Sequence, residues 1–340
     1  MNRGRRSETT RRLPLGKIPI DLLDSTVLRL TGGESDRVAT PPRAGVDFAA
    51  VKVARGFMIV SSDPISGVTE QIGRYAVKVS ANDVATSGNR PEFAESVVLL
   101  PEGSSEADLR AIAKQVDAAA KESGIAILGG HTEVTPGLSH PIVVVTVFAF
   151  AEKYVTSGGA KAGDVILMTK TAGLEGTSEL AREHDFEGLL PAATLRSARR
   201  LIELLDVTPE ATAAFGTGRV HGMHDCTEGG VLGAVYEMSV ASGLGFVLEE
   251  DAVPVSPETR EICDALSIDP LRLIGSGSLI IAVAKGSEAL VMDAVSPTSR
   301  VTRVGEFRQR GRSFRRRDGT EENIREAPED ELWRVLSRPR

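Results

Sequence analysis

The sequence has very little cysteine, and this scarcity excludes two kinds of scaffold. Its 340 residues include 2 cysteines, Cys226 and Cys263, which stand far apart and lack the spacing of a zinc site. We therefore expect neither a disulfide framework nor a metal centre built from cysteine. A chain without disulfides is typical of a reducing compartment, so the expected location is the cytoplasm.

Long hydrophobic runs are absent as well. The longest run, residues 142–151, is too short to cross a bilayer, and the arginine-rich beginning lacks the apolar segment of a signal peptide. These two absences predict a soluble protein with no membrane partner.

The chain has no excess of positive charge. Its formal net charge is −7, whereas a protein that binds nucleic acid needs a basic face to neutralise phosphates, so no nucleic-acid partner is expected. The basic residues gather near both ends of the chain, which predicts solvated tails there. We expect a disordered basic N-terminus over residues 1–12 and a charged tail over residues 308–340.

The common nucleotide-binding loops are also missing, since neither G-x-x-x-x-G-K-[ST] nor G-x-G-x-x-G occurs. What is present is a glycine-rich globular composition, with 41% hydrophobic residues and 34 glycines. The length predicts two domains with separate cores. A change in composition near residue 155 divides them into residues 13–155 and 156–307.

The first domain is organised around a stretch in which a strand ends at one aspartate and the following helix ends near another. A β-prone run over residues 57–60 stops at Asp63 and Pro64, and the helical spacing that starts at Ile72 puts Asp83 on the apolar face. A buried carboxylate costs several kcal/mol unless a cation or N–H donors compensate it. Asp63 and Asp83 are therefore either two walls of a metal or phosphate site, or a helix cap and a half-exposed helix end.

Three further positions in this domain could serve a ligand. Lys17 lies in a loop framed by glycine and proline, which suits a phosphate contact but is also common for an exposed lysine. Asp47 stands at a turn into a strand that pairs with residues 57–60 as a hairpin. A short buried strand over residues 125–128 runs into Gly129-Gly130-His131-Thr132, where the backbone either approaches a ligand closely or makes a tight turn.

The second domain has one markedly polar cluster, ahead of a helix over residues 231–242. His221, His224, Asp225 and Cys226 could form a transition-metal site, although their spacing is not that of H-E-x-x-H. The alternative is a helix start capped by an Asp or Thr side chain, with glycines that allow close packing.

The order of predicted elements favours an α+β fold. In the first domain a strand pair, a helix, a strand, a second helix and two strands follow one another, which predicts helices on one side of a sheet. In the second domain strands over residues 165–169, 245–249, 279–283 and 301–307 alternate with helices, as in an α/β unit.

Several blocks, taken in order, resemble the AIR synthase-related (PurM-like) family. They are Gly16-Lys17-Ile18-Pro19, Gly45-Val46-Asp47-Phe48, Ser62-Asp63-Pro64, Asn82-Asp83-Val84-Ala85, Gly129-Gly130-His131-Thr132, Met223-His224-Asp225 with Thr227, Gly229 and Gly230, and Gly275-Ser276-Gly277. The resemblance implies a two-domain PurM-like fold, with a βαβ-type N-terminal domain that forms a dimeric barrel and an α/β C-terminal domain. It also implies a homodimer, Mg-ATP in a cleft, and ATP-driven activation of an amide-type oxygen or phosphate transfer to a small-molecule acceptor.

The same resemblance implies roles for individual residues. Magnesium would be held by Asp47, Asp63, Asp83 and Asp225, the cleft would be lined by Lys17, Asn82, Gly129, Gly130, Thr132 and Thr227, and the catalytic residues would be Lys17, Asp83 and His131. Lys17 would neutralise phosphate charge as it develops.

Departures from the pattern point to one branch. Residues 261–271 are most similar to the hydrogenase-maturation (HypE-like) branch, yet the chain ends Ser337-Arg338-Pro339-Arg340, without that branch's terminal cysteine, and His131 stands where several members have an acidic residue. We therefore expect a related ATP-dependent enzyme with a different acceptor. The alternative is a nucleotide-binding maturation or regulatory partner without full turnover, and a partner protein is left open.

Overall fold

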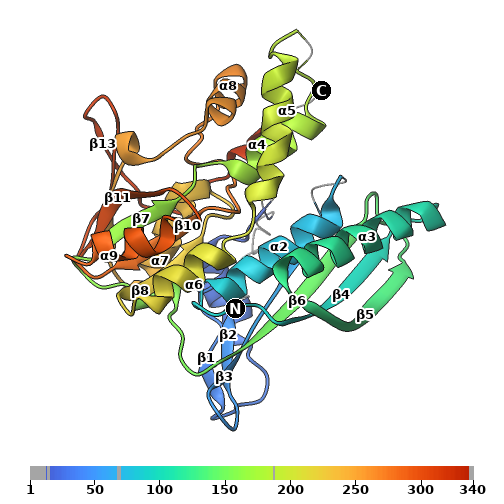
Figure 1. Cartoon of the computed structure of the whole chain (residues 1–340), viewed down its shortest axis with the longest axis horizontal. Helices are drawn as coiled ribbons and strands as arrows, with labels where there is room; N and C mark the ends of the chain where they lie inside the picture. Colours follow the sequence, from blue (N-terminus) through green and yellow to red (C-terminus); the bar gives the residue numbers. More distant parts are fainter. Residues whose placement is uncertain (1–12, 14–15, 67–69, 187, 337–340) are drawn as a thin grey trace, which may run out of the picture.

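The computed structural model describes residues 13, 16–66, 70–186 and 188–336, arranged around two sheets that each carry helices (Figure 1). The predicted disordered N-terminus, residues 1–12, lies outside the described residues. Among the described helices, none combines the length and the apolar character that a bilayer crossing requires.

The N-terminal sheet has six strands in the order β1-β2-β3-β6-β4-β5. Helices α2 and α3 cover one of its faces, as the element order predicts (Figure 1). The elements of this half are α1 (Ile20–Ser25), β1 (Val38–Thr40), β2 (Ala49–Lys52), β3 (Phe57–Ile65), α2 (Ile72–Ala85), β4 (Phe93–Leu100), α3 (Glu106–Ser123), β5 (Ala126–Val134) and β6 (Ile142–Ala151).

Local sequence explains where these elements begin and end. Ser105 and Asp108 form a reciprocal capping box at the start of α3, and Gly124 ends this helix with a left-handed φ of 69°. The hairpin between β2 and β3 is present as predicted. Helix α2 is buried along almost its whole length, including Asp83 in its last turn, because it lies between the sheet and the C-terminal half.

Two predicted strands differ from those observed. Strand β3 does not stop at Asp63 and Pro64 but runs on to Ile65. Past Val60 it has a strand neighbour on one side only, so the missing N–H of Pro64 is tolerated. Strand β5 is neither short nor buried: it continues through the glycines to Val134 and is exposed throughout, because it is the edge strand paired only with β4.

The C-terminal sheet has seven strands in the order β13-β12-β9-β11-β7-β10-β8. Its strands are β7 (Val165–Thr169), β8 (Val220–Asp225), β9 (Gly245–Glu249), β10 (Leu279–Val283), β11 (Val301–Arg308), β12 (Arg312–Arg315) and β13 (Glu321–Asn323). Its helices are α4 (Leu174–Glu183), α5 (Ala192–Arg200), α6 (Thr208–Gly216), α7 (Gly230–Ser242), α8 (Pro257–Leu266), α9 (Glu288–Val295) and α10 (Glu331–Leu336). Short 3-10 turns are η1 (Val27–Arg29), η2 (Ser157–Gly159), η3 (Leu201–Leu204) and η4 (Glu250–Ala252).

Strand β7 shows why strands of this sheet have continuous apolar sequences. All of its residues are buried, with Ile166 and Met168 in one core and Val165 and Leu167 in another on the opposite face. Both faces are therefore covered. The sheet includes β8, which was not predicted because its polar letters do not show a strand pattern.

The segment predicted as a charged tail is folded as far as Leu336. Strand β12 lies parallel to β9, and β13 pairs with β12. The basic run belongs to the folded part of the chain, although Arg315 and Arg317 are exposed as predicted: their side chains are 44% and 61% exposed, and they form surface ion pairs with Glu249 at 2.7 Å and with Asp251 at 2.6 Å. The compensating carboxylates come from η4 and β9, which are distant in sequence.

Candidate functional site

A cleft of about 1530 Å³ is lined by residues of both halves of the chain. The N-terminal half contributes side chains from the loops before β2, from β3 and from α2, and the C-terminal half contributes the end of β8, helices α4 and α7, and the segment around α10. The predicted residues that line it are Lys17, Asp47, Asp63, Asp83, Asp225 and Thr227.

Four aspartates line this cleft: Asp47 from the loop before β2, Asp63 from β3, Asp83 from α2 and Asp225 from the end of β8. Asp83 is 8% exposed and Asp225 fully buried. Burial raises the pKa of Asp83 well above its usual range, and the carboxylates of Asp63, Asp225 and Asp47 raise it further. Burial also raises the pKa of Asp47 to about 7, although the neighbouring His224 opposes this shift. The folded chain therefore holds these carboxylates close together although they repel one another.

The oxygens of this cluster fit a hard divalent cation. Both side-chain oxygens of Asp225, and one oxygen each of Asp47 and Asp63, are buried with no hydrogen-bond partner among the described residues. Mg²⁺ prefers carboxylate, water and phosphate oxygens, so this donor set suits it. Ser61 steadies the arrangement, since its hydroxyl lies 2.7 Å from Asp83 Oδ2.

Both ring nitrogens of His224 make polar contacts. Its Nε2 lies 2.9 Å from Glu237 Oε2 and 3.2 Å from Asp47 Oδ1, and its Nδ1 lies 2.8 Å from the Asp225 carbonyl oxygen. Burial alone would lower the pKa of His224, but Asp47, Asp225 and Glu237 together raise it well above its usual value. A protonated imidazole donates from both nitrogens and holds the carboxylates of the two halves together.

Lys17 lies at the cleft, as predicted, and is held by the C-terminal half. Its Nζ lies 3.1 Å from Thr227 Oγ1 and 3.3 Å from Glu237 Oε1, and its backbone N–H donates to Glu228 Oε2 at 2.7 Å. Burial opposes the charge, but Glu237 and the other carboxylates raise the pKa of Lys17. Its ammonium group, on a side chain that is 49% exposed, is available at the cleft.

Glu237 was not identified from the sequence. Burial would raise its pKa, but Lys17 and His224 lower that pKa to about 2. The available signal was a lone charge in the otherwise apolar helix α7.

The predicted transition-metal alternative is not assembled. The close group of potential ligands at this position comprises Asp47, His224 and Asp225, without His221 or Cys226. His221 Nδ1 instead lies 2.9 Å from Asp164, and Cys226 lies in the core, where burial raises the pKa of its thiol.

The other alternative, a side-chain-capped helix start, is half right. Helix α7 has Gly229 at its N-cap and no side-chain cap. The glycines do serve close packing, since a Cβ on Gly230 would lie 2.6 Å from the Leu273 carbonyl oxygen.

Asn82 does not line the cleft, in contrast to the expectation for it. It is fully buried, its Nδ2 donates to the Leu205 carbonyl oxygen at 2.7 Å, and its Oδ1 accepts from the Val207 N–H at 3.0 Å. Within one subunit, the Asn82 side chain joins α2 to the C-terminal half.

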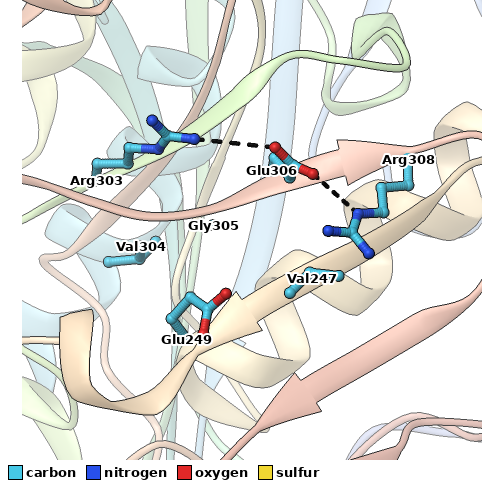
Figure 2. Close-up of a pocket in the computed structure, with 7 residues that line it drawn as sticks. All are labelled: Val247, Glu249, Arg303, Val304, Gly305, Glu306 and Arg308. Atoms are coloured by element: carbon cyan, nitrogen blue, oxygen red, sulfur yellow. Dashed lines mark hydrogen bonds and ion pairs between the residues drawn. The ribbon is translucent and has the colours of Figure 1, made fainter.

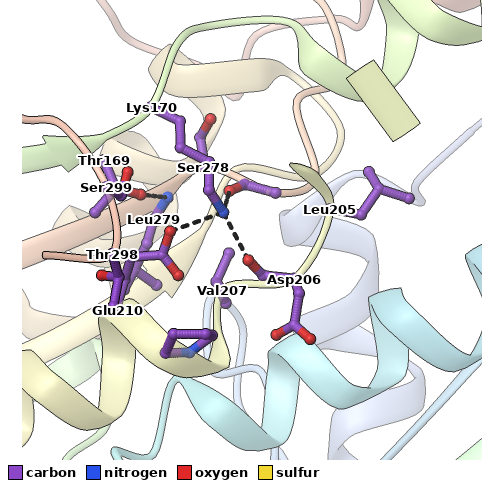
Figure 3. A network of polar contacts seen from close by, with 12 residues as sticks. Thr169, Lys170, Leu205, Asp206, Val207, Glu210, Ser278, Leu279, Thr298 and Ser299 are labelled. Carbon is purple, nitrogen blue, oxygen red and sulfur yellow. Dashed lines mark hydrogen bonds and ion pairs between the residues drawn. The ribbon is translucent and has the colours of Figure 1, made fainter. Parts of the chain in front are cut away.

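Asp206, which contacts α2, also belongs to a network of polar contacts within the C-terminal half (Figure 3). Lys78, also on α2, pairs with Asp206 at 2.9 Å. Lys170, at the end of β7, donates to the carbonyl oxygens of Asp206 and Gly277 and pairs with Glu210 at 2.9 Å. Burial lowers the pKa of Lys170, and Glu210 opposes this effect.

The predicted glycine-rich segment lies away from this cleft in the single chain. Gly129, Gly130, His131 and Thr132 belong to the exposed edge strand β5 and are absent from the cleft lining. A Cβ on Gly130 would lie 1.7 Å from the Ser96 carbonyl oxygen, so this glycine permits close strand pairing. His131 Nε2 lies 3.1 Å from Glu133.

A smaller hollow of about 340 Å³ lies over β9 and β11 (Figure 2). Its charged side chains are paired, since Glu306 lies between Arg303 and Arg308, and Glu249 pairs with Arg315 outside the hollow. It offers no buried unpartnered side-chain atom among the described residues, and we assign it no ligand.

Comparisons with known proteins agree with this architecture. The N-terminal domain of AIR synthase related protein matches residues 45–151, and the C-terminal domain of that family matches residues 161–317. The carbamoyl dehydratase HypE of Cupriavidus necator is 30% identical over 289 residues, covering 80% of this chain and 79% of the relative. The carbamoyl dehydratase HypE of Escherichia coli is 33% identical over 239 residues, covering 68% of each.

Solved structures show the same fold. The crystal structure of E. coli HypE aligns with a TM-score of 0.71 at 23% identity, covering 92% of this chain and 99% of that one. A ThiL protein complexed with AMPPCP and TMP aligns with a TM-score of 0.69 at 18% identity, covering 91% and 94%.

Proposed function

Because the chain belongs to the AIR synthase related protein family, we propose that it is an ATP- and Mg²⁺-dependent enzyme that activates an amide or carbamoyl-type oxygen by phosphorylation, or transfers phosphate to a small acceptor. Its relatives include carbamoyl dehydratases, and similar structures include HypE in complex with ATP. Both cysteines are free and buried, which supports a cytoplasmic location.

The observation that carries the proposal is the buried carboxylate cluster. A fully buried Asp225 with neither oxygen satisfied is unfavourable unless a cation completes it. Asp47, Asp63, Asp83 and Asp225 would hold Mg²⁺, which neutralises phosphate charge when it is bound.

The chain's own residues then have distinct tasks. Lys17 presents its ammonium group to the transferred phosphate, because the adjoining carboxylates keep it charged. His224 and Glu237 fix the position of the Asp47 side chain relative to the end of β8. Ser61 fixes Asp83, and Asn82 fixes α2 to the other half.

We also propose a homodimer formed through the open face and free edge of the N-terminal sheet. Edge strand β5 exposes Ile127, Leu128 and Val134, and β6 exposes Phe150 at 53%. Such an edge and apolar face favour pairing with another chain. Pairing would bring the Gly129 to Thr132 segment, and His131 with it, against the other subunit.

The second candidate is a nucleotide-binding partner without full turnover. It is favoured by the position of His131, which lies outside the cleft of its own chain. A solved complex of the similar protein HypE with HypF makes a protein partner a reasonable extension of either candidate.

The test is ADP formation by the purified full chain with Mg-ATP, against amide, carbamoyl and amine metabolites, with EDTA as a control. We expect stimulation by one class of acceptor, and its loss in Asp225→Asn. The matched variant Asp293→Asn, at an exposed position in α9, should retain activity. Tight Mg-ATP binding with no turnover for any acceptor supports the second candidate. Absence of Mg-ATP binding overturns both.

A further inference from the structure

One wall of the cleft carries acidic side chains that are not part of the aspartate cluster. Glu175 lies in the first turn of α4, is 3% exposed and lines the cleft, and its Oε2 has no hydrogen-bond partner among the described residues. Glu179 follows one helical turn later and is 6% exposed. Ser276 and Asp330, the latter three residues before Trp333, act directly on Glu175, and we call Glu175, Ser276 and Trp333, which all line the cleft, the acceptor wall.

No cation of the described chain pairs with this wall. Two other acidic residues of the cleft are satisfied within the chain: Glu237 by Lys17 and His224, and Asp330 by the backbone N–H groups of Gly229 and Leu332. By contrast, the described part of the chain forms no ion pair with Glu175 or Glu179. The charged groups that act most strongly on Glu175 are all acidic, namely Asp330, Asp225 and Glu228.

Burial raises the pKa of Glu175 to about 7, and burial together with Glu175 raises the pKa of Glu179 further. The wall therefore holds protons that a bound cation would displace. This agrees with the geometry, in which a residue that lines the cleft has a buried carboxylate oxygen with no partner among the described residues.

Trp333 gives the wall an aromatic surface. It is the only tryptophan of the chain, it lines the cleft, and its indole Nε1 is buried without a partner. Tyr236 also lines the cleft, but Arg312 already lies over its ring, 5.0 Å from the centroid. No such cation covers Trp333 in the described residues, and an indole face is the best side-chain platform for one.

We propose that the acceptor wall binds a cationic nitrogen group, an ammonium, amidinium or guanidinium, of the molecule that the enzyme phosphorylates. Glu175 supplies the opposing charge, Ser276 a hydroxyl partner and Trp333 the stacking face. This inference rests on the proposed function only in identifying the bound molecule as the one that is phosphorylated. The binding of the cationic group can be measured without turnover.

The experiment uses the single tryptophan as the reporter. The full chain, saturated with Mg²⁺ and AMPPCP, is titrated with benzamidinium, benzamide and benzoate, which share one shape and differ in charge. We expect saturable quenching of Trp333 fluorescence by benzamidinium, with affinity at least about tenfold higher than for benzamide, and no binding of benzoate. Equal affinity for benzamide and benzamidinium overturns the proposal.

Variants separate this site from the aspartate cluster. Glu175→Gln should weaken benzamidinium binding at least about tenfold while leaving AMPPCP affinity within about twofold. Ser276→Ala, which keeps the wall charge, should weaken it less, and Glu203→Gln, at an exposed position in η3, should not change it. If Glu175→Gln weakens AMPPCP binding and spares benzamidinium, Glu175 belongs to the metal cluster and the proposal fails. If the unmodified chain does not bind AMPPCP, the proposed function is refuted instead.

Discussion

Asn82 and Asp83 are consecutive in α2, but Asp83 contacts the N-terminal half and Asn82 contacts the C-terminal half. The Asp83 carboxylate faces the cleft beside Ser61, whereas the Asn82 amide is hydrogen-bonded to the backbone of Leu205 and Val207. One turn of one helix therefore both carries a side chain of the candidate site and sets the distance of that side chain from the C-terminal half.

Replacing Asn82 with alanine should loosen this junction. Two buried hydrogen bonds are lost and two backbone groups are left unsatisfied, so the free energy of unfolding should fall by about 2–4 kcal/mol. The affinity for Mg-ATP should fall as well, because Asp83 and Asp225 lose their fixed separation. Urea denaturation and nucleotide titration measure the two effects. Asn323→Ala, at an exposed position in β13, is the control, and an unaltered nucleotide affinity in Asn82→Ala would argue against a positioning role.

Asp83→Asn should separate stability from ligand binding. In the apo protein the carboxylate is repelled by its neighbours, so its removal should leave the melting temperature unchanged or raise it. The stabilisation by Mg-ATP should fall by at least a few kcal/mol, the scale of losing one partner at a buried charged site. Thermal melts with and without Mg-ATP test this. A destabilised apo protein with normal nucleotide binding would make Asp83 structural. Zinc alone should stabilise neither protein.

The apo protein should lose stability between pH 6 and pH 8. Burial raises the folded-state pKa of Glu175 and of Asp330 to about 7, so the folded state keeps protons that the unfolded state releases. This stabilisation is present at low pH and is lost as the pH rises through 7. Each group should contribute about 1 kcal/mol over that range. Denaturation of the apo protein in EDTA at several pH values checks the slope, which Glu175→Gln should reduce and Glu203→Gln should not.

The assembly prediction concerns the free sheet edge. Leu128 is 60% exposed on β5, and Leu128→Lys should place charges in the proposed interface and yield a monomer. Leu189→Lys, at a position that is 64% exposed in the C-terminal half, should leave the dimer intact. Light scattering at micromolar concentration distinguishes the two. A folded monomer of the unmodified chain would refute the dimer.

The sequence predicted the burial of Asp83 because helical spacing places it on the apolar face with Ile72 and Val79. It could not predict the direction of Asn82, since adjacent helical residues point to different neighbours and only the tertiary structure shows which. The prediction for strand β5 was wrong for a related reason: a short apolar run looks the same in a covered strand and in an exposed edge strand.

The acceptor wall and the folded C-terminal segment were missed on other grounds. Glu175 and Glu179 one turn apart look like the solvated face of an ordinary helix, and nothing local shows that this face is buried. The basic residues between Arg308 and Arg317 look like part of an unfolded tail because the carboxylates with which they pair, such as Glu249 and Asp251, are far away in the chain.

The place of α10 in the cleft has a consequence for synthesis on the ribosome. Asp47, Asp63 and Asp83 emerge with the first sheet, and domains generally fold as they emerge, N-terminal first. The cleft also requires residues 325–330, Trp333 and Arg334, which are translated last among its lining residues. The nascent chain therefore carries its aspartates before it has a site, and nucleotide can bind the complete cleft only after nearly the whole described chain has left the exit tunnel.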